Sequence, residues 1–285
     1  MPNEPWTIKK LLDWTTEYFK KYQTDNPHLE AEILLARAIN VERIKLYIDF
    51  EKEPDKNGLE IFKGFITRRA KGEPAAYITG NKHFMSLNFI VTPDVLIPRP
   101  ETELLVENTI EVSKSYKGKI SILDIGTGSG AIAISLAKFI DNADIYATDT
   151  SAKALEIATQ NAKKHDVESI IKFIEADLFP KEELKFDIIV SNPPYIKTSD
   201  ISSLQPEIRN HEPISALNGG PDGLDYYRRI LEKAGNYLKE GGYLLLEIGA
   251  DQSKDVIKII NDRLKLKNIL IKKDMSGLDR VVIAS

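Results

Sequence analysis

The first 74 residues carry hydrophobic side chains at the spacing of helix faces. Apolar and aromatic residues recur every three or four positions between Ile8 and Tyr22, which predicts an amphipathic helix. Asn26 followed by Pro27 is typical of a helix start, and this second helix is predicted to run to about Ile39. A third helix is predicted over residues 55–70. We therefore expect an N-terminal all-helical domain over residues 1–74.

The hydrophobic period changes to two in the next segment. Alternation is clearest at four apolar positions, Met85, Leu87, Phe89 and Val91. This spacing is typical of strands, and it predicts a β-hairpin linker over residues 75–92. The turn of the hairpin is predicted near Gly80-Asn81-Lys82.

Strand patterns and helix patterns alternate from residue 93 to residue 285. The predicted strands cover residues 120–125, 144–148, 170–174, 186–190, 243–248, 269–272 and 280–283. The predicted helices cover residues 101–113, 130–139, 151–165, 225–238 and 252–262. Such alternation favours a mostly parallel sheet covered on both faces by helices. The fold class is therefore α/β, preceded by a small helical domain.

Composition argues against several classes of function. The chain has no Cys and only four scattered His, so we expect no disulfide and no metal. A formal net charge of -4 provides no basic footprint for nucleic acid. The N-terminus lacks the pattern of a signal peptide, and no apolar run reaches the length of a membrane span. We expect a cytoplasmic monomer with no stable nucleic-acid or membrane partner.

A stiff turn follows the apolar run 186–190. It reads Ser191-Asn192-Pro193-Pro194-Tyr195, and two successive prolines must end the strand in an extended, rigid loop. Open α/β sheets hold their ligands at the carboxyl ends of strands, where this turn lies. The turn offers an amide side chain, carbonyl groups and an aromatic ring. That set suits a flat group that bears an NH2.

A glycine-rich loop follows the first predicted strand of the α/β domain. It reads Asp124-Ile125-Gly126-Thr127-Gly128-Ser129-Gly130 and leads into a helix. Asp149 stands at the end of the next strand, where a carboxylate in nucleoside-binding domains accepts hydrogen bonds from ribose hydroxyls. The dinucleotide fingerprint Gly126-x-Gly128-x-x-Ala131 is also satisfied. The loop alone therefore leaves both a nicotinamide cofactor and S-adenosylmethionine open.

The glycine loop and the proline turn together resemble the class I S-adenosylmethionine-dependent methyltransferases that methylate planar nitrogens. The chain is more closely similar to the PrmC/HemK family, which methylates the glutamine of the Gly-Gly-Gln motif in class 1 peptide-chain release factors. The resemblance spans nearly the whole chain. Its narrower marks are Ile97-Pro98-Arg99-Pro100-Glu101-Thr102-Glu103, His211-Glu212-Pro213 and the segment 219–224. It implies a Rossmann-like methyltransferase sheet over residues 93–285 and a substrate-docking role for the helical domain.

The resemblance also implies roles for individual residues. The expected cofactor contacts are Gly126, Thr127, Gly128, Ser129, Gly130, Asp149, Asp177, Leu178 and Asn192. The expected contacts of the glutamine are Asn192, Pro193, Pro194 and Tyr195, of which Asn192, Pro193 and Tyr195 are the expected catalytic residues. Leu178 and Leu96 stand where relatives often carry an aromatic residue, and Phe179 is expected to compensate beside the adenine. The methyl donor would leave as S-adenosylhomocysteine.

Five further residues carry an expectation. We expect His211 and Glu212 to order a loop. For Arg99 two interpretations are open, contact with an acidic partner or a cofactor carboxylate, and a structural salt bridge. The pair Tyr226-Tyr227 is expected to pack in the core.

Other functions remain open from the sequence. They are methylation of a glutamine in a ribosomal protein, methylation of adenine N6 in nucleic acid, a nicotinamide-dependent oxidoreductase, and a nucleotide-binding module without catalysis. An exocyclic adenine amine fits the same kind of pocket, although such enzymes must also grip phosphates and extract a base.

Overall fold

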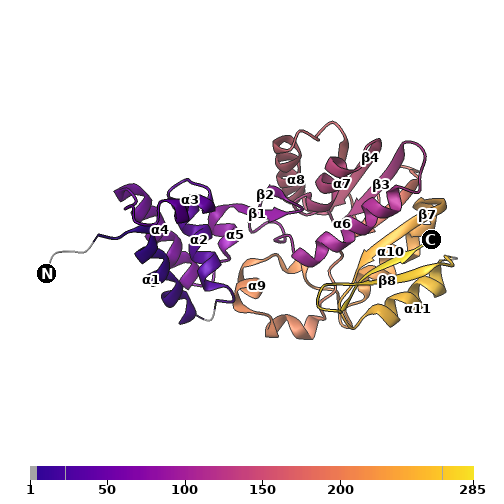
Figure 1. Cartoon of the computed structure of the whole chain (residues 1–285). Coiled ribbons are helices and arrows are strands. Elements are labelled where there is room, and N and C mark those ends of the chain that lie inside the picture. The colour runs from indigo at the N-terminus through magenta and orange to yellow at the C-terminus, as the bar shows by residue number, and fades with distance from the viewer. Residues whose placement is uncertain (1–4, 23, 265) are drawn as a thin grey trace. The chain divides into compact units, whose positions relative to one another are not determined.

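A computed structural model describes residues 5–22, 24–264 and 266–285 of the chain (Figure 1). Residues 1–4, 23 and 265, which fall within the predicted domains, lie outside the described residues. The chain divides into two compact units. The first comprises the residues up to Asn81 together with 206–211, and the second comprises 82–205 and 212–285.

The first unit is helical. Its helices are α1 (Ile8–Lys20), α2 (Pro27–Ala38), α3 (Arg43–Ile48), α4 (Lys56–Ala70), α5 (Ala75–Thr79) and α9 (Pro206–His211). Side chains cap two of these helices, because the Thr7 hydroxyl accepts from the Lys10 amide and the Asp55 carboxylate accepts from the Gly58 amide. The core of the unit contains fully buried large side chains such as Leu12, Phe19 and Phe62.

A buried arginine attaches α9 to the other helices of this unit. Arg69 is 6% exposed, and its guanidinium contacts Glu30 of α2 and, at 2.6 Å, Glu207 of α9. Two carboxylates around one arginine satisfy a charge that would be costly to bury alone. Residues 206–211 therefore group with the helical unit, although the sequence analysis placed them in the α/β domain.

The second unit is built on a mixed sheet. Its strands are β3 (Ile120–Ile125), β4 (Ala143–Asp149), β5 (Ile171–Glu175), β6 (Phe186–Ser191), β7 (Leu238–Glu247), β8 (Ile269–Lys273) and β9 (Asp279–Ala284). Their order across the sheet is β5-β4-β3-β6-β7-β9-β8. Pairs from β5 to β7 are parallel, whereas β9 is antiparallel to both of its neighbours.

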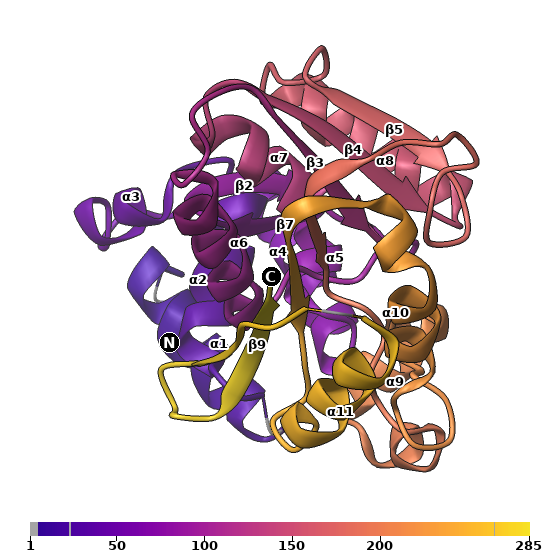
Figure 2. The same cartoon turned by 90° about the vertical axis from the view of Figure 1, so that its right-hand side faces the viewer.

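Helices cover both faces of this sheet, as Figure 2 shows for α6 on one side and for α10 and α11 on the other. The first face packs against α6 (Pro100–Ser113), α7 (Ala131–Phe139) and α8 (Ala152–Lys164). The second face packs against α10 (Asp225–Tyr237) and α11 (Ser253–Arg263). The central strands β3 and β6 are thus buried on both sides, which explains their nearly continuous apolar sequences, whereas the edge strand β5 is partly exposed and the edge strand β8 is largely exposed.

Several predicted elements need correction. Residues 75–79 form the short helix α5, and the hairpin consists of β1 (Asn81–Phe84) and β2 (Leu87–Ile90). Its turn lies at Met85-Ser86, and both residues have positive φ. Gly80 does not form the turn of the hairpin, because it ends α5 in the left-handed conformation. The first strand of the hairpin therefore begins where the sequence analysis placed the turn. The helices α3 and α9 and the 3-10 turns η1 (Thr198–Ser203) and η2 (Ile214–Ala216) were not predicted.

Candidate active site

The candidate site lies where the strand order reverses. The chain proceeds from β3 outward through β4 and β5, and then returns to pair β6 with the other side of β3. Ile125 pairs with Ser191, and the Ser191 hydroxyl donates to the Ile125 carbonyl at 2.8 Å. The glycine loop after β3 and the proline turn after β6 are therefore adjacent. This reversal point is where open α/β sheets bind ligands.

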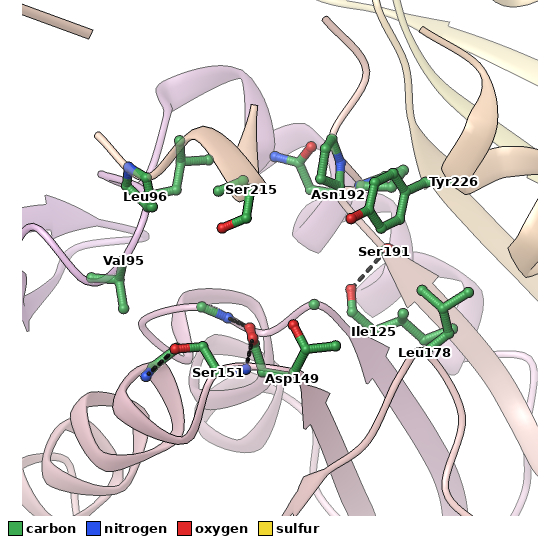
Figure 3. A pocket seen from close by; sticks show the side chains of 18 of the residues that line it. Val95, Leu96, Ile125, Asp149, Ser151, Leu178, Ser191, Asn192, Ser215 and Tyr226 are labelled. Atoms are coloured by element: carbon green, nitrogen blue, oxygen red, sulfur yellow. Dashed lines mark hydrogen bonds between the residues drawn. The ribbon is translucent and has the colours of Figure 1, made fainter. Parts of the chain in front are cut away.

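A cavity of about 290 Å³ opens at this point (Figure 3). Its volume is close to the lower end of the range of small-molecule sites, about 300–1,000 Å³. Predicted site residues that line it are Gly126, Gly128, Asp149, Asp177, Leu178, Asn192, Pro193 and Pro194. Leu96 also lines it, as expected. Thr127, Ser129, Gly130 and Tyr195 were predicted as site residues but do not line the cavity.

Asp149 connects the glycine loop to the N-cap of α8 beside the cavity. Its Oδ2 accepts from the Gly128 amide at 2.9 Å, and its Oδ1 accepts from the Ser151 amide at 2.9 Å. Each carboxylate oxygen keeps a further lone pair, and the side chain is half-buried at the cavity wall. The position therefore suits a ligand with two adjacent hydroxyl groups, such as a ribose.

The glycine loop holds a backbone conformation that other residues rarely adopt. Gly126, Gly128 and Gly130 have φ values of 73°, 54° and 80°. At Gly130 a Cβ would also come within 2.8 Å of Ile134, so this glycine serves the packing of α7 on α8. Thr127 is buried and donates its hydroxyl to Asp124 at 2.7 Å, away from the cavity.

Asp124 is completely buried beneath this loop. Burial raises its pKa to about 7, and the Thr127 hydrogen bond only partly opposes that rise. Its second oxygen, Oδ1, has no hydrogen-bond partner among the described residues.

The proline turn presents Asn192 to the cavity and holds Tyr195 behind the wall. The Asn192 Nδ2 donates to the Thr102 hydroxyl at 3.0 Å, and Thr102 belongs to the first turn of α6. The Tyr195 carbonyl accepts from the Gln252 side chain at 3.0 Å, and burial raises the pKa of the Tyr195 phenol to about 12. Tyr195 therefore anchors the turn rather than lining the cavity.

Leu178 contributes a buried apolar wall, whereas Phe179 faces another way. Phe179 stacks on Tyr237 with ring centroids 4.5 Å apart and is absent from the lining. The neighbouring Asp177 is exposed, and its carboxylate pairs with Arg229 at 2.6 Å.

Glu212 ties the segment after α9 to the segment before α6. Its carboxylate accepts from the Ile97 amide at 3.2 Å and from the Arg99 guanidinium at 2.5 Å. Arg99 thus forms a salt bridge within the α/β unit, which is the structural alternative that the sequence left open. The neighbour of Glu212 in the chain, His211, belongs to the helical unit.

Several lining residues were not assigned to the site from the sequence. They are Pro93, Asp94, Val95, Ile125, Thr150, Ser151, Ala154, Ala176, Ser191, Pro213, Ser215, Ala216, Tyr226 and Ile230. Tyr227 is fully buried as expected, and Tyr226 is partly buried against the same core but also lines the cavity. The helical period of α10 separates these two adjacent tyrosines, a signal that could have distinguished them.

Comparison with known proteins matches both units to family models. Residues 10–80 match the PrmC N-terminal domain, and residues 100–208 match the methyltransferase small domain. Over 98% of the chain, it is 42% identical to the release factor glutamine methyltransferase of Geobacter sulfurreducens, covering 96% of that protein. It is 43% identical to that of Moorella thermoacetica, with 98% of each chain covered.

The chain belongs to the release factor glutamine methyltransferase family.

Solved structures agree with the fold of a family member. The catalytic domain of hMettl16, in complex with the MAT2A 3'UTR hairpin 6, has a TM-score of 0.56 at 15% identity, covering 78% of this chain and 81% of that one. The Thermus thermophilus 16S rRNA N2 G1207 methyltransferase has a TM-score of 0.53 at 17% identity, covering 72% and 49%. These similarities establish the Rossmann-like class I methyltransferase fold.

The described residues contain neither a candidate metal site nor a candidate membrane span. No cluster of three or more His, Cys, Asp or Glu side chains that could hold a metal ion occurs among them. Within the same residues, no helix has the length and apolar character required to cross a membrane.

Proposed function

We propose that this chain transfers a methyl group from S-adenosylmethionine to the side-chain amide nitrogen, N5, of the glutamine in the Gly-Gly-Gln motif of class 1 peptide-chain release factors. The observation that carries the proposal is one cavity, in a chain of this family, that joins Asp149 and the glycine loop to Asn192-Pro193-Pro194. A nucleoside subsite and an amide subsite thus meet at the strand reversal.

The residues of the cavity fit the cofactor. Bound S-adenosylmethionine supplies an electrophilic methyl group on its sulfonium sulfur. Asp149 would hold the ribose hydroxyls, and the backbone of Gly126 and Gly128 would allow close approach of the amino-acid part. Asp177 and Leu178 would flank the adenine, with Tyr226 and Ile230 supplying further apolar wall. We assign Thr127, Ser129 and Gly130 to shaping the loop.

The proline turn addresses the weak nucleophilicity of an amide. A glutamine amide nitrogen is a poor nucleophile because its lone pair is delocalised into the carbonyl group. The Asn192 side-chain carbonyl and the Pro193 backbone carbonyl would accept its two N–H bonds and aim the nitrogen at the methyl group. Orientation of this kind lowers barriers by roughly 7–11 kcal/mol in favourable model reactions. No dedicated base is required before transfer.

The helical unit carries a surface suited to a protein substrate. Trp14 stacks on Tyr18 with ring centroids 5.0 Å apart, Trp6 meets Trp14 edge-on at 6.4 Å, and Tyr22 contacts Tyr18 at 5.0 Å. Trp6, Trp14 and Tyr22 are 47–50% exposed. Exposed aromatic residues are typical anchors of protein interfaces. We propose that this aromatic row docks the release factor, and that the enzyme acts as a cytoplasmic monomer without a stable nucleic-acid partner.

The deciding experiment is methyl transfer from labelled S-adenosylmethionine to a purified class 1 release factor. The label should appear on the intact factor and vanish when the Gly-Gly-Gln glutamine is replaced by asparagine or alanine. Labelling that persists on the changed factor contradicts the proposal. Ribosomal protein and duplex DNA are the parallel acceptors, and transfer to either one in place of the factor would establish the corresponding alternative. Preferential binding of NADH over S-adenosylhomocysteine would indicate an oxidoreductase.

A further inference from the structure

A buried glutamate lies behind the proline turn and has no part in the chemistry described so far. Glu247 ends β7 and is 1% exposed. The register pairs Ser191 with Leu246, so Asn192 and Glu247 are the next residues of two neighbouring parallel strands. Glu247 therefore lies at the same edge of the sheet as the candidate acceptor site.

Thr102 lies between this glutamate and the cavity. Its side chain is buried, and its hydroxyl oxygen accepts from the Asn192 Nδ2 at 3.0 Å. The same hydroxyl and the Tyr195 hydroxyl face the Glu247 carboxylate, and hydrogen bonding from these two hydroxyls opposes the rise in its pKa. A hydroxyl that accepts from an amide keeps its own proton to donate. The chain of donors thus runs from Asn192 through Thr102 to Glu247.

An ionised carboxylate at the end of such a chain determines which group donates and which accepts in each hydrogen bond. A carboxylate can only accept, so the Thr102 proton must point to Glu247, and the Thr102 oxygen must then receive the NH2 end of Asn192. The carbonyl end of Asn192 is left for another donor. That is the end the proposed function needs, because a glutamine amide presents N–H groups.

We propose that Glu247 is a positioning residue for the acceptor glutamine, acting through Thr102 to fix which end of the Asn192 amide faces the cavity. This inference rests on the proposed function for the identity of the acceptor, but the orientation of Asn192 belongs to the protein alone.

The surroundings of Glu247 agree with this role. Burial raises its pKa from 4.5 to about 7, hydrogen bonds and Arg280 on β9 oppose the rise, and Glu101 on α6 adds to it. Tyr195 and Tyr227 of α10 also face it, and the Tyr227 hydroxyl donates to the Glu247 backbone carbonyl at 2.9 Å. Its Oε2 has no hydrogen-bond partner among the described residues. An acid kept in so unfavourable a place contributes little to stability, which favours a functional reason for it.

The first test measures methyl transfer at saturating release factor and cofactor. Thr102→Val and Glu247→Gln should each lower kcat about tenfold or more, because an Asn192 amide that is no longer held in one orientation does not position the acceptor nitrogen. Thr102→Ser should recover activity to about half of wild type or better, since it restores the hydroxyl. The matched control is Thr109→Val, another buried threonine of α6 whose hydroxyl donates to the Leu105 carbonyl, and it should keep wild-type kcat. Cofactor Kd should stay within about threefold in all of these variants.

A second readout needs no acceptor. In wild-type protein the side-chain ¹⁵N–¹H signals of Asn192, identified by their loss in Asn192→Ala, should shift with a midpoint near pH 7. The shift should disappear in Glu247→Gln and in Thr102→Val. An Asn192 signal that ignores both substitutions, or a wild-type kcat in both, overturns the inference. If the signals behave as expected but no release factor is methylated, the effect of Glu247 on the orientation of Asn192 is supported and the proposed function fails.

Discussion

At the scale of single residues, the proposed function assigns cofactor binding and acceptor binding to different side chains. Asp149 accepts two backbone amides and faces the cavity from the β4 side, whereas Asn192 is held by Thr102 on the β6 side. The two side chains share a cavity but have no hydrogen bond to each other among the described residues. Substitution of Asp149 should therefore affect cofactor binding, and substitution of Asn192 should affect turnover.

Asp149→Asn should weaken binding of S-adenosylmethionine about tenfold or more, because an amide cannot accept from both the Gly128 and Ser151 amides. Asn192→Ala should abolish turnover while leaving cofactor affinity within about threefold of wild type. Calorimetric titration with S-adenosylhomocysteine and the methyl-transfer assay separate these effects. The control is Asp94→Asn, an exposed carboxylate at the same cavity that pairs with Lys153. Equal loss of binding and turnover in Asn192→Ala would contradict the assigned division.

At the scale of elements, α1 and the two residues after it present a buried face and an exposed aromatic face. Ile8, Leu12 and Phe19 lie in the core of the helical unit, whereas Trp14 and Tyr22 are exposed. The sequence pattern placed Tyr22 on the buried face because aromatic residues are usually counted as apolar. A helix with a full apolar face inward needs no exposed aromatic row for stability, so the row is available for a partner.

Replacing Trp14 and Tyr22 together by alanine should raise the KM for an intact release factor about tenfold or more, as loss of interface anchors does. Methylation of a short Gly-Gly-Gln peptide should be unaffected, since the peptide is too small to need this surface. Met275→Ala is the control, because Met275 is fully exposed in the α/β unit. An unchanged KM for the intact factor would refute docking on α1.

At the scale of the whole molecule, two buried acids link stability to pH. Burial raises the pKa of Asp124 from 3.8 and that of Glu247 from 4.5, each to about 7. Between the ordinary and the raised values the folded chain keeps protons that the unfolded chain has released. The free energy of unfolding must therefore fall as pH rises through this window.

Urea denaturation should show a loss of at least about 1 kcal/mol between pH 5 and pH 7 in wild-type protein. Asp124→Asn combined with Glu247→Gln should flatten that decline, because neither amide titrates. Carboxylates with lowered pKa, such as the exposed Asp222 beside Arg228 and the half-buried Asp274 beside Arg280, act in the opposite sense but only at lower pH. A wild-type stability that is level or rising from pH 5 to pH 7 would be incompatible with two such buried acids.

Local pattern was enough for much of this fold. The strands β3, β4, β5 and β6 and the helices that follow β3 and β4 lie within a few residues of their predicted bounds. Local pattern failed for short elements, whose conformation depends on the segments packed around them. The helix α5 and the turn at Met85-Ser86 were missed because five residues carry too little periodicity to be separated from a strand.

The sequence by itself determined the chemistry of the site, because each of the two motifs is one continuous run of residues that directly follows a strand. Gly126 to Gly130 and Asn192 to Tyr195 owe their conformations to glycine and proline, whose backbone preferences are local. Only the tertiary structure decided what surrounds them. Tyr226 reaches the cavity, α9 joins the helical unit, and Glu247 lies at the end of the strand beside the one that leads to Asn192. Those outcomes depend on strand register and burial between segments far apart in the chain, which no local pattern contains.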